Sequence, residues 1–331
     1  MNVRKFAKPL LGLLVSALFV WLVLRSVSLD DVGAVLARVR PGWLVLALGL
    51  FFLGYACRIW RWKLMLQTEN PELDWGRCAV PFMASIAANN VLPFRAGDVL
   101  RAFGFSRWLG VPSASVLATL LAERLMDLLA LLCALGLALA LLDRAGTTQN
   151  VLPALSTAGA VMTAAAVLLL LLLPGFVERP INALIDLLGR RAPGPAQGVR
   201  RQSGLVFSTL RALAHRGRMP VLLAWSLAAW VFEAAVFYAV ARSVPDLAAP
   251  IAAWLAMPVG TLSTLLPSTP GYIGTFHYFV ISATELFGNT AAASAAFALL
   301  VHLALWIPAT VWGGVSFLYW ILRRPVQTDP A

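Results

Sequence analysis

Two Leu-Pro-x-x-x-Gly sequences, at residues 92–97 and 266–271, interrupt apolar stretches of this chain. Each stretch that they interrupt is too short to supply the roughly 20 residues that a spanning helix needs. Proline removes a backbone donor and glycine permits positive φ, so each sequence is expected to break a helix inside a membrane. Broken backbone at that depth is tolerated only where protein or a water-filled cavity covers it. Paired breaks indicate a transport site, and two unrelated loops are the alternative.

The composition indicates a polytopic membrane protein. The 331 residues are 60% hydrophobic and 12% charged, whereas soluble domains are about 25% charged. The net charge of +11 would suggest nucleic acid as the partner of a soluble protein. Here we attribute it to arginine-rich cytoplasmic loops that face anionic lipid, and we expect no nucleic-acid partner. Three cysteines and three histidines are scattered along the chain, which predicts no metal site, no disulfide framework and no cofactor.

The apolar runs predict an all-α protein with a single membrane domain over residues 1–331. About six runs are expected to span, at residues 9–24, 43–63, 113–142, 151–176, 220–241 and 291–322. Residues 79–109 and 251–287 each contain one Leu-Pro break, and we expect them to form re-entrant hairpins. A cleavable signal peptide is the alternative for the first run.

Arginine counts set the expected orientation. Residues 177–219 contain eight arginines and two acids, so this segment is predicted to lie in the cytoplasm as basic amphipathic helices on the membrane. Both termini are then cytoplasmic, and residues 143–150 lie outside. Span, hairpin and span over residues 43–142 repeat in inverted orientation over residues 220–322, with the Leu-Pro sequences offset by 174 residues. This inverted-topology repeat places the expected site between the hairpins.

Basic and aromatic residues alternate at the end of the second run, at Arg58, Trp60, Arg61, Trp62 and Lys63. Tryptophan and arginine at the end of a span are typical of an interface anchor, in which the basic groups reach lipid phosphates. We therefore expect these arginines at the membrane surface.

Charged residues inside predicted spans are functional candidates. Glu123 and Asp127 share one helix face, and Arg124 lies beside it. They predict either a proton- or cation-coupled cluster, a site for a headgroup, or an ion-pair network with Arg95 or Arg101 that fixes the first hairpin. A further intramembrane acid, Glu233, is expected to pair with Arg58, Arg61 or Arg242.

Arg95 and Arg101 flank the first break, with Asp98 between them. A guanidinium presents a planar fork that suits phosphate, and a helix N-terminus at Gly97 would add positive potential. These residues predict capture of an anionic phosphate headgroup. The alternative is that Arg95 pairs with Asp98 or Glu123 for structural reasons.

The side chains of the second break are uncharged. They favour either a site that hydrogen-bonds a neutral group or a gate. The expected substrate-binding residues are Asn89, Asn90, Arg95, Asp98, Arg101, Glu123, Arg124, Asp127, Ser268, Thr269 and Tyr272. The expected hinge and backbone residues are Pro93, Gly97, Pro267, Pro270, Gly271 and Gly274. His277 is expected to be a buried core histidine.

Two further patterns bear on catalysis. The chain has no Gly-x-x-x-x-Gly-Lys-Ser/Thr sequence, which argues against an ATPase of that type. Membrane glycosyltransferases that use polyprenyl-phosphate sugars carry acids in a first outer loop, where this chain has Asp30 and Asp31. Two acids at a helix start are more simply an N-cap.

Three motifs together resemble one family: the sequence Asn-Asn-Val-Leu-Pro-Phe-Arg-Ala-Gly-Asp-Val-Leu-Arg at 89–101, Glu-Arg-Leu-Met-Asp at 123–127, and Leu-Pro-Ser-Thr-Pro-Gly-Tyr-Ile-Gly at 266–274. They are similar to the flippase-like family named after the transmembrane region of lysylphosphatidylglycerol synthase, over nearly the whole chain. The resemblance implies an inner-membrane protein that moves lipid between leaflets. No counterpart of the synthase's soluble aminoacyl-transferase domain follows residue 322, so we expect no enzyme.

The sequence thus predicts a translocator of a polar or anionic lipid in the inner (plasma) membrane. Arg95 and Arg101 would hold the headgroup, and Glu123, Arg124 and Asp127 would line or gate the cavity. The expected partners are membrane lipids, with anionic headgroups at the cytoplasmic face, and self-association to a homo-oligomer is left open. The alternatives are a membrane enzyme that uses a polyprenyl-phosphate donor and a structural subunit of a lipid-assembly complex.

Overall fold

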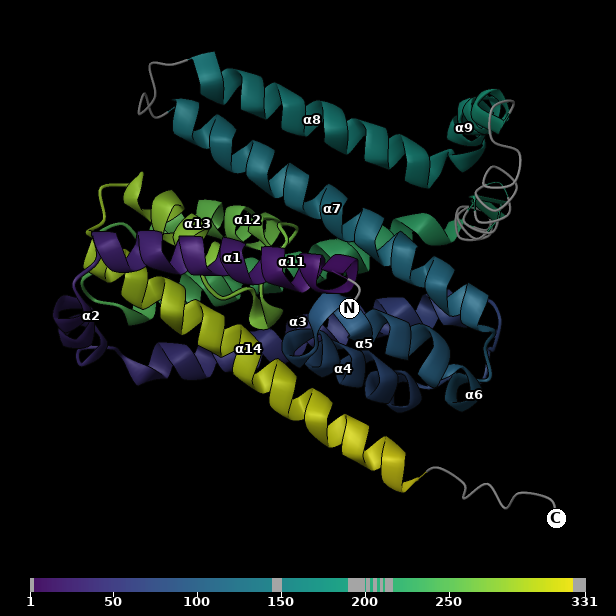
Figure 1. The fold of residues 1–331 in the computed structure, drawn as a ribbon, viewed down its shortest axis with the longest axis horizontal. Helices are drawn as coiled ribbons and strands as arrows, with labels where there is room; N and C mark the ends of the chain where they lie inside the picture. Colours follow the sequence, from purple (N-terminus) through teal and green to yellow (C-terminus); the bar gives the residue numbers. More distant parts are fainter. Residues whose placement is uncertain are drawn as a thin grey trace.

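A computed structural model describes residues 3–144, 151–189, 200, 203–204, 207–208, 211 and 217–323, and every regular element within them is helical (Figure 1). This confirms the all-α expectation. The long helices are α1 (Val3–Ser26), α3 (Pro41–Leu66), α4 (Trp75–Val91), α7 (Ser113–Arg144), α8 (Val151–Leu172), α11 (Arg218–Ser243) and α14 (Ala291–Leu322). The shorter ones are α2 (Leu29–Leu36), α5 (Ala96–Val99), α6 (Ser106–Leu109), α9 (Pro174–Gly189), α12 (Ala253–Ser263) and α13 (Thr275–Glu285).

Several helices are long and apolar enough to cross a bilayer. Among the described residues α3, α11 and α14 meet this description, and the number rises to five if the bent pairs α1–α2 and α8–α9 each form one span. The two bends measure 81° and 98°. α7 has 32 residues, roughly 48 Å at 1.5 Å per residue, but carries three charges near its middle. The protein is therefore a multi-pass membrane protein, and the count of six spans stays a prediction.

Two expected segments fall partly outside the described residues. The first is the expected outer loop at 143–150, most of which is not described. The second is the basic segment at 177–219, of which most of the second half is not described. The first amphipathic helix of that segment is α9, which begins at Pro174 rather than at residue 177. At the N-terminal side, Ser28 caps α2 by accepting a hydrogen bond from the backbone of Asp31. Asp30 and Asp31 lie in the first turn, so the capping residue is the serine that precedes them.

Close helix pairs organise the bundle. α11 packs along α3, α14 along α4, and α7 along α8, which run side by side at one edge in Figure 1. Small residues allow the closest approach, as is common between membrane helices. A Cβ added to Gly313 of α14 would lie 2.1 Å from the carbonyl oxygen of Met83 in α4. These two helices therefore fix the position of the first break, which follows α4.

Each Leu-Pro break lies at the tip of a helical hairpin. In the first hairpin, α4 is followed by the 3₁₀ turn η1 (Pro93–Arg95), α5, the π-helical turn η2 (Leu100–Gly104) and α6. Its base is closed by two hydrogen bonds: Arg77 Nε donates to the Trp108 carbonyl oxygen at 2.8 Å, and Trp108 Nε1 donates to that of Arg77 at 2.9 Å. The hairpin begins at Trp75, earlier than residue 79, because Asp74 caps α4.

The second hairpin consists of α12, the 3₁₀ turn η5 (Pro270–Tyr272) and α13. Asn289 closes its base by exchanging hydrogen bonds with the backbone of Ala249. The two tips meet, since α4 contacts η5. α1 covers the second tip: Ser16 Oγ donates to Thr269 Oγ1 at 3.0 Å and accepts from the Thr269 amide at 2.9 Å.

Candidate functional site

The two breaks contain similar short turns. Each has a 3₁₀ turn that begins with proline and ends with a residue in the left-handed region, Arg95 (φ 52°) and Tyr272 (φ 58°). Among the described residues these two are the non-glycine residues with positive φ. The two turns are 177 residues apart, whereas the Leu-Pro sequences are offset by 174 residues.

The glycines of the two motifs have different roles. Gly271 has φ 75°, as expected for a turn. Gly97 does not have positive φ, and it is needed for close packing instead. A Cβ on Gly97 would lie 1.9 Å from the Ser85 carbonyl oxygen and 2.7 Å from Asn89 Oδ1. The expected anion site at the helix N-terminus also disappears, because α5 is only four residues long.

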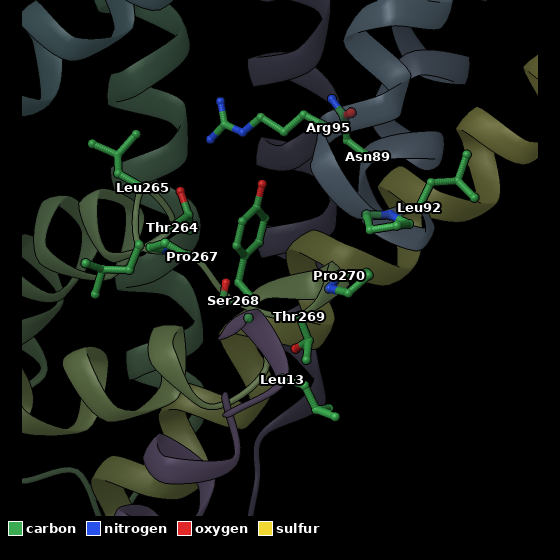
Figure 2. A pocket seen from close by; sticks show the side chains of 14 residues that line it. Leu13, Asn89, Leu92, Arg95, Thr264, Leu265, Pro267, Ser268, Thr269 and Pro270 are labelled. Carbon is green, nitrogen blue, oxygen red and sulfur yellow. The ribbon is translucent and has the colours of Figure 1, made fainter. Parts of the chain in front are cut away.

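A cavity of about 460 Å³ lies between the two tips, and we call it the tip cavity (Figure 2). Figure 2 shows the Arg95 side chain reaching from the first tip across the cavity toward Thr264 and Leu265. Ser268 lies on the opposite side, and its buried hydroxyl has no hydrogen-bond partner among the described residues. The full lining is Gly12, Leu13, Asn89, Leu92, Pro93, Arg95, Thr264, Leu265, Leu266, Pro267, Ser268, Thr269, Pro270 and Tyr272.

A second cavity of about 390 Å³, here called the charged cavity, adjoins the first. Arg95, Thr264 and Leu265 line both. Its lining contains both charged and apolar side chains. The charged side chains, called here the charged wall, are Arg58, Arg61, Arg95, Arg101, Glu123, Arg124 and Asp127, and the apolar ones include Phe82, Ile86, Leu125, Leu128, Leu131 and Leu262.

Two carboxylates of α7 fix the charged wall. Glu123 accepts from Arg101 at 2.7 Å and forms a longer ion pair with Arg61, at 3.5 Å. Asp127 accepts from Arg61 at 2.7 Å and from Trp230 Nε1 at 3.2 Å. Arg61 also donates to the hydroxyl of Ser226 in α11. The side chains of Arg61 and Glu123 are 1% and 4% exposed, so this network joins α3, α7 and α11 away from solvent.

Arg101 has donors to spare. Its guanidinium stacks over Trp62 and Phe82, with 4.9 and 4.7 Å from the guanidinium carbon to the ring centres. Its Nη2 binds Glu123, whereas Nε and Nη1 are buried and have no hydrogen-bond partner among the residues that the structure describes. Buried polar groups are normally satisfied, so two such donors on one side chain are unusual.

The structure identifies the partners of the two remaining acids, Asp98 and Glu233, which the sequence analysis had left open. Asp98 pairs with Arg124 at 3.0 Å and accepts from Asn89 at 2.9 Å. Glu233 pairs with Arg58 at 2.9 Å. The predicted structural pairing of Arg95 with Asp98 or Glu123 is therefore wrong. Arg95 forms no ion pair or hydrogen bond with any residue that the structure describes.

The expected site residues are brought together in part. Asn89, Arg95, Ser268, Thr269 and Tyr272 line the tip cavity. Asn90, Gly271 and Tyr272 line a third cavity of about 140 Å³, together with Glu233 and His302. Arg101, Glu123, Arg124 and Asp127 line the charged cavity. Asp98, Gly97 and Gly274 line none of the three and support the tips instead.

Sequence reasoning did not include Arg58 and Arg61 among the expected site residues and placed them at the membrane surface, although it named both as possible partners of Glu233. Arg61 is 1% exposed and Arg58 is held against Glu233. Three acids lie inside predicted spans, and the two arginines share a helix face at a spacing of three residues. Acids inside the spans need basic partners, so this charge complementarity could have identified Arg58 and Arg61 as buried residues. In the described part of the chain, no group of three or more histidine, cysteine or acidic residues is arranged to hold a metal ion.

The family follows from comparison with known proteins. The family model described as "Lysylphosphatidylglycerol synthase TM region" matches residues 10–313, a range that contains all three motifs. This chain belongs to that family. The match confirms the resemblance drawn from those motifs.

Two curated relatives from archaea are similar to this chain. One, Glycosyltransferase AglD of Haloferax volcanii, is 25% identical over 92% of this chain and 53% of its own length. The other, a UPF0104 membrane protein of Methanocaldococcus jannaschii, is 24% identical over 37% of each chain. This chain thus spans about half the length of the glycosyltransferase that it matches.

These names correct one expectation. We expected no enzyme. A relative named as a glycosyltransferase and a family named after a synthase contradict this, since both point to an enzyme-related family.

Proposed function

We propose that this protein moves a polar or anionic lipid between leaflets and that Arg95 binds the lipid's phosphate during the passage. The observation that carries the proposal is the position of Arg95. It is half-buried, has no partner in the described part of the chain, and lines both the tip cavity and the charged cavity.

The energetic cost of this arrangement favours a functional role. An arginine at membrane depth is expensive unless it is paired. Holding a non-glycine residue in the left-handed region costs roughly 1–2 kcal/mol more. Strain of this kind concentrates at ligand clamps and switches. A guanidinium fork matches the oxygens of a phosphate group, and Arg101 contributes further unsatisfied donors to the same wall.

The hairpins supply a route. Their tips are in contact, and residues of both tips line the tip cavity. Inverted-repeat transporters have this arrangement, with the site at the repeat interface near the bilayer midplane. In our proposal six spans and two re-entrant hairpins form the repeat in the plasma membrane, with both termini in the cytoplasm. The headgroup passes through the cavities while the acyl chains stay in lipid.

A second candidate function is favoured by the glycosyltransferase relative. Here the same cavities would hold the phosphate of a polyprenyl-phosphate-linked sugar, and the reaction would occur at the membrane. The relative's name supports this candidate, whereas the geometry supports transport more directly, because Glu123 and Asp127 are both engaged by arginine.

One experiment separates the two functions. Purified protein is placed in liposomes with fluorescent phosphatidylglycerol, and dithionite bleaching reports the lipid that moves between leaflets. A parallel sample receives a polyprenyl-phosphate sugar and is assayed by mass spectrometry for sugar transfer to lipid or peptide acceptors. Transport predicts bleaching beyond the outer-leaflet fraction of protein-free liposomes. Sugar transfer without such bleaching would favour the enzyme.

A further inference from the structure

The charges around the tip cavity and the charged cavity nearly cancel. Five arginines line the charged cavity, and four carboxylates bind four of these arginines. The pairs are Arg58 with Glu233, Arg61 with Asp127 and Glu123, Arg101 with Glu123, and Arg124 with Asp98. Five positive and four negative charges leave an excess of one. That charge belongs to Arg95, which pairs with no residue that the structure describes.

We infer that the ligand is a lipid with a monoanionic phosphodiester headgroup. This inference rests on the proposed function, because it names the class of lipid that the same site would carry. A phosphodiester has one negative charge at neutral pH, which neutralises the single excess positive charge. In a low-dielectric site an uncompensated charge of either sign is costly.

Other lipid headgroups fit the charge balance less well. A phosphomonoester carries about −1.5 to −2 at pH 7, because its second pKa is near 6. It would leave the site with excess negative charge. A zwitterionic phosphocholine group has no net charge and would bring a second cation beside Arg95. Charge therefore separates the candidates although all contain phosphate.

The donors of the site match the acceptors of a diester. Its two non-bridging oxygens accept hydrogen bonds, and the fork of Arg95 offers two donors. Within the described part of the chain, Nε and Nη1 of Arg101 beside the charged cavity and the Ser268 hydroxyl beside the tip cavity also have no hydrogen-bond partner. Arg101 remains neutralised by Glu123, so its spare donors add hydrogen bonds without changing the net charge.

Two natural lipid classes contain this group: glycerophospholipids such as phosphatidylglycerol, and polyprenyl phosphates esterified to a sugar. The shared chemistry is the monoanionic diester, and the binding experiment below includes one probe of each class. The mass of the lipid retained by protein purified from membranes then identifies the source.

The test measures lipid binding to the detergent-solubilised protein by native mass spectrometry at pH 8. The probes are phosphatidylglycerol, phosphatidic acid and phosphatidylcholine with identical acyl chains, and a polyprenyl-phosphate glucoside. We expect the two diesters without a cationic group to bind on the order of tenfold more tightly than the other two probes. Preference for phosphatidic acid or phosphatidylcholine would overturn the inference.

Two substitutions shift the charge balance in opposite directions. Arg95→Gln brings the site to neutrality and should abolish the preference for phosphatidylglycerol over phosphatidylcholine. Asp98→Asn raises the excess by one and should shift preference toward phosphatidic acid. If Asp98→Asn does not fold, Glu233→Gln raises the charge by the same amount. Arg107→Gln, at an exposed residue near the hairpin base, is the control and should leave all preferences unchanged.

The outcomes separate this inference from the proposed function. The protein could select diesters, with a selectivity that follows the charge changes, and yet move no lipid in liposomes. That result would support the inference about the ligand and contradict the proposed transport. Lipid movement without diester selectivity would remove the inference alone. Variants that keep the wild-type preferences would also overturn it.

Discussion

Arg95 and Tyr272 hold the same position in the two 3₁₀ turns that interrupt the hairpins. Each is the third residue of a 3₁₀ turn that begins with proline, and each is held in the left-handed region. Both side chains line the tip cavity. The two turns therefore place one cation and one phenol at the same cavity, where in our proposal a headgroup needs a charge and a hydrogen-bonding partner.

The backbone strain at Arg95 gives a prediction that separates conformation from charge. Asparagine tolerates the left-handed region, whereas a β-branched residue does not. Arg95→Asn should therefore keep the thermal stability of the wild type, while Arg95→Val should be about 1–2 kcal/mol less stable. Both should lose lipid movement. Thermal unfolding in detergent measures the first effect, and equal melting temperatures for the two variants would contradict the strain.

Gly97 should not tolerate a side chain, because its Cβ would collide with the Ser85 carbonyl oxygen at 1.9 Å. Gly97→Ala should lower stability by about 1–3 kcal/mol, as overpacking does. The control is Gly159→Ala in α8, where nothing lies within 4 Å of the added Cβ. That variant should be neutral or slightly stabilising. Similar melting temperatures for both would argue against the close contact between α5 and α4.

Glu123 should be the most costly carboxylate to remove. Glu123→Gln leaves Arg101 without a carboxylate and weakens the interaction with Arg61, at an expected cost of about 3–5 kcal/mol. The matched control is Asp186→Asn, which breaks a pair with Arg200 whose two side chains are 55% and 61% exposed. Exposed pairs contribute about 0–1 kcal/mol. A small effect at Glu123 would mean that the network does not hold the first hairpin.

Orientation can be tested at two exposed residues within the described chain. Glu72 lies in the loop between α3 and α4, and Glu285 ends α13. The arginine distribution places the first loop in the cytoplasm and the second outside. In a background without the native cysteines, Glu285→Cys should react with an impermeant thiol reagent in intact cells and Glu72→Cys should not. The reverse labelling would invert the proposed topology.

Hydrophobic length and turn chemistry were sufficient to place most helices. The span at 291–322 has the bounds of α14, and the start of α7 at Ser113 was also predicted. Both breaks fall where Leu-Pro sequences occur. Apolar runs and proline act locally, so their consequences are visible in the sequence.

The partners of the charged residues depend on tertiary structure and were not predictable in the same way. Arg61 resembles a surface anchor because it lies near the end of an apolar run beside two tryptophans. Its true environment depends on α7 and α11, which follow much later in the chain. Likewise, the contact of Ser16 with Thr269 joins residues 253 positions apart. Gly12 and Ser16 have the small-x-x-x-small spacing that could have suggested this close contact.

The most direct test of the account is the rate of lipid movement catalysed by Arg95 variants in liposomes. Because Arg95 has no protein partner in the described chain, its substitution should leave the fold intact. Arg95→Lys keeps the charge but loses the planar fork, and Arg95→Gln loses both. At matched incorporation and unchanged melting temperature, we predict a strongly reduced rate for Arg95→Lys, and a rate for Arg95→Gln near that of protein-free liposomes. A stable Arg95→Gln protein that moves phosphatidylglycerol at the wild-type rate would contradict the account.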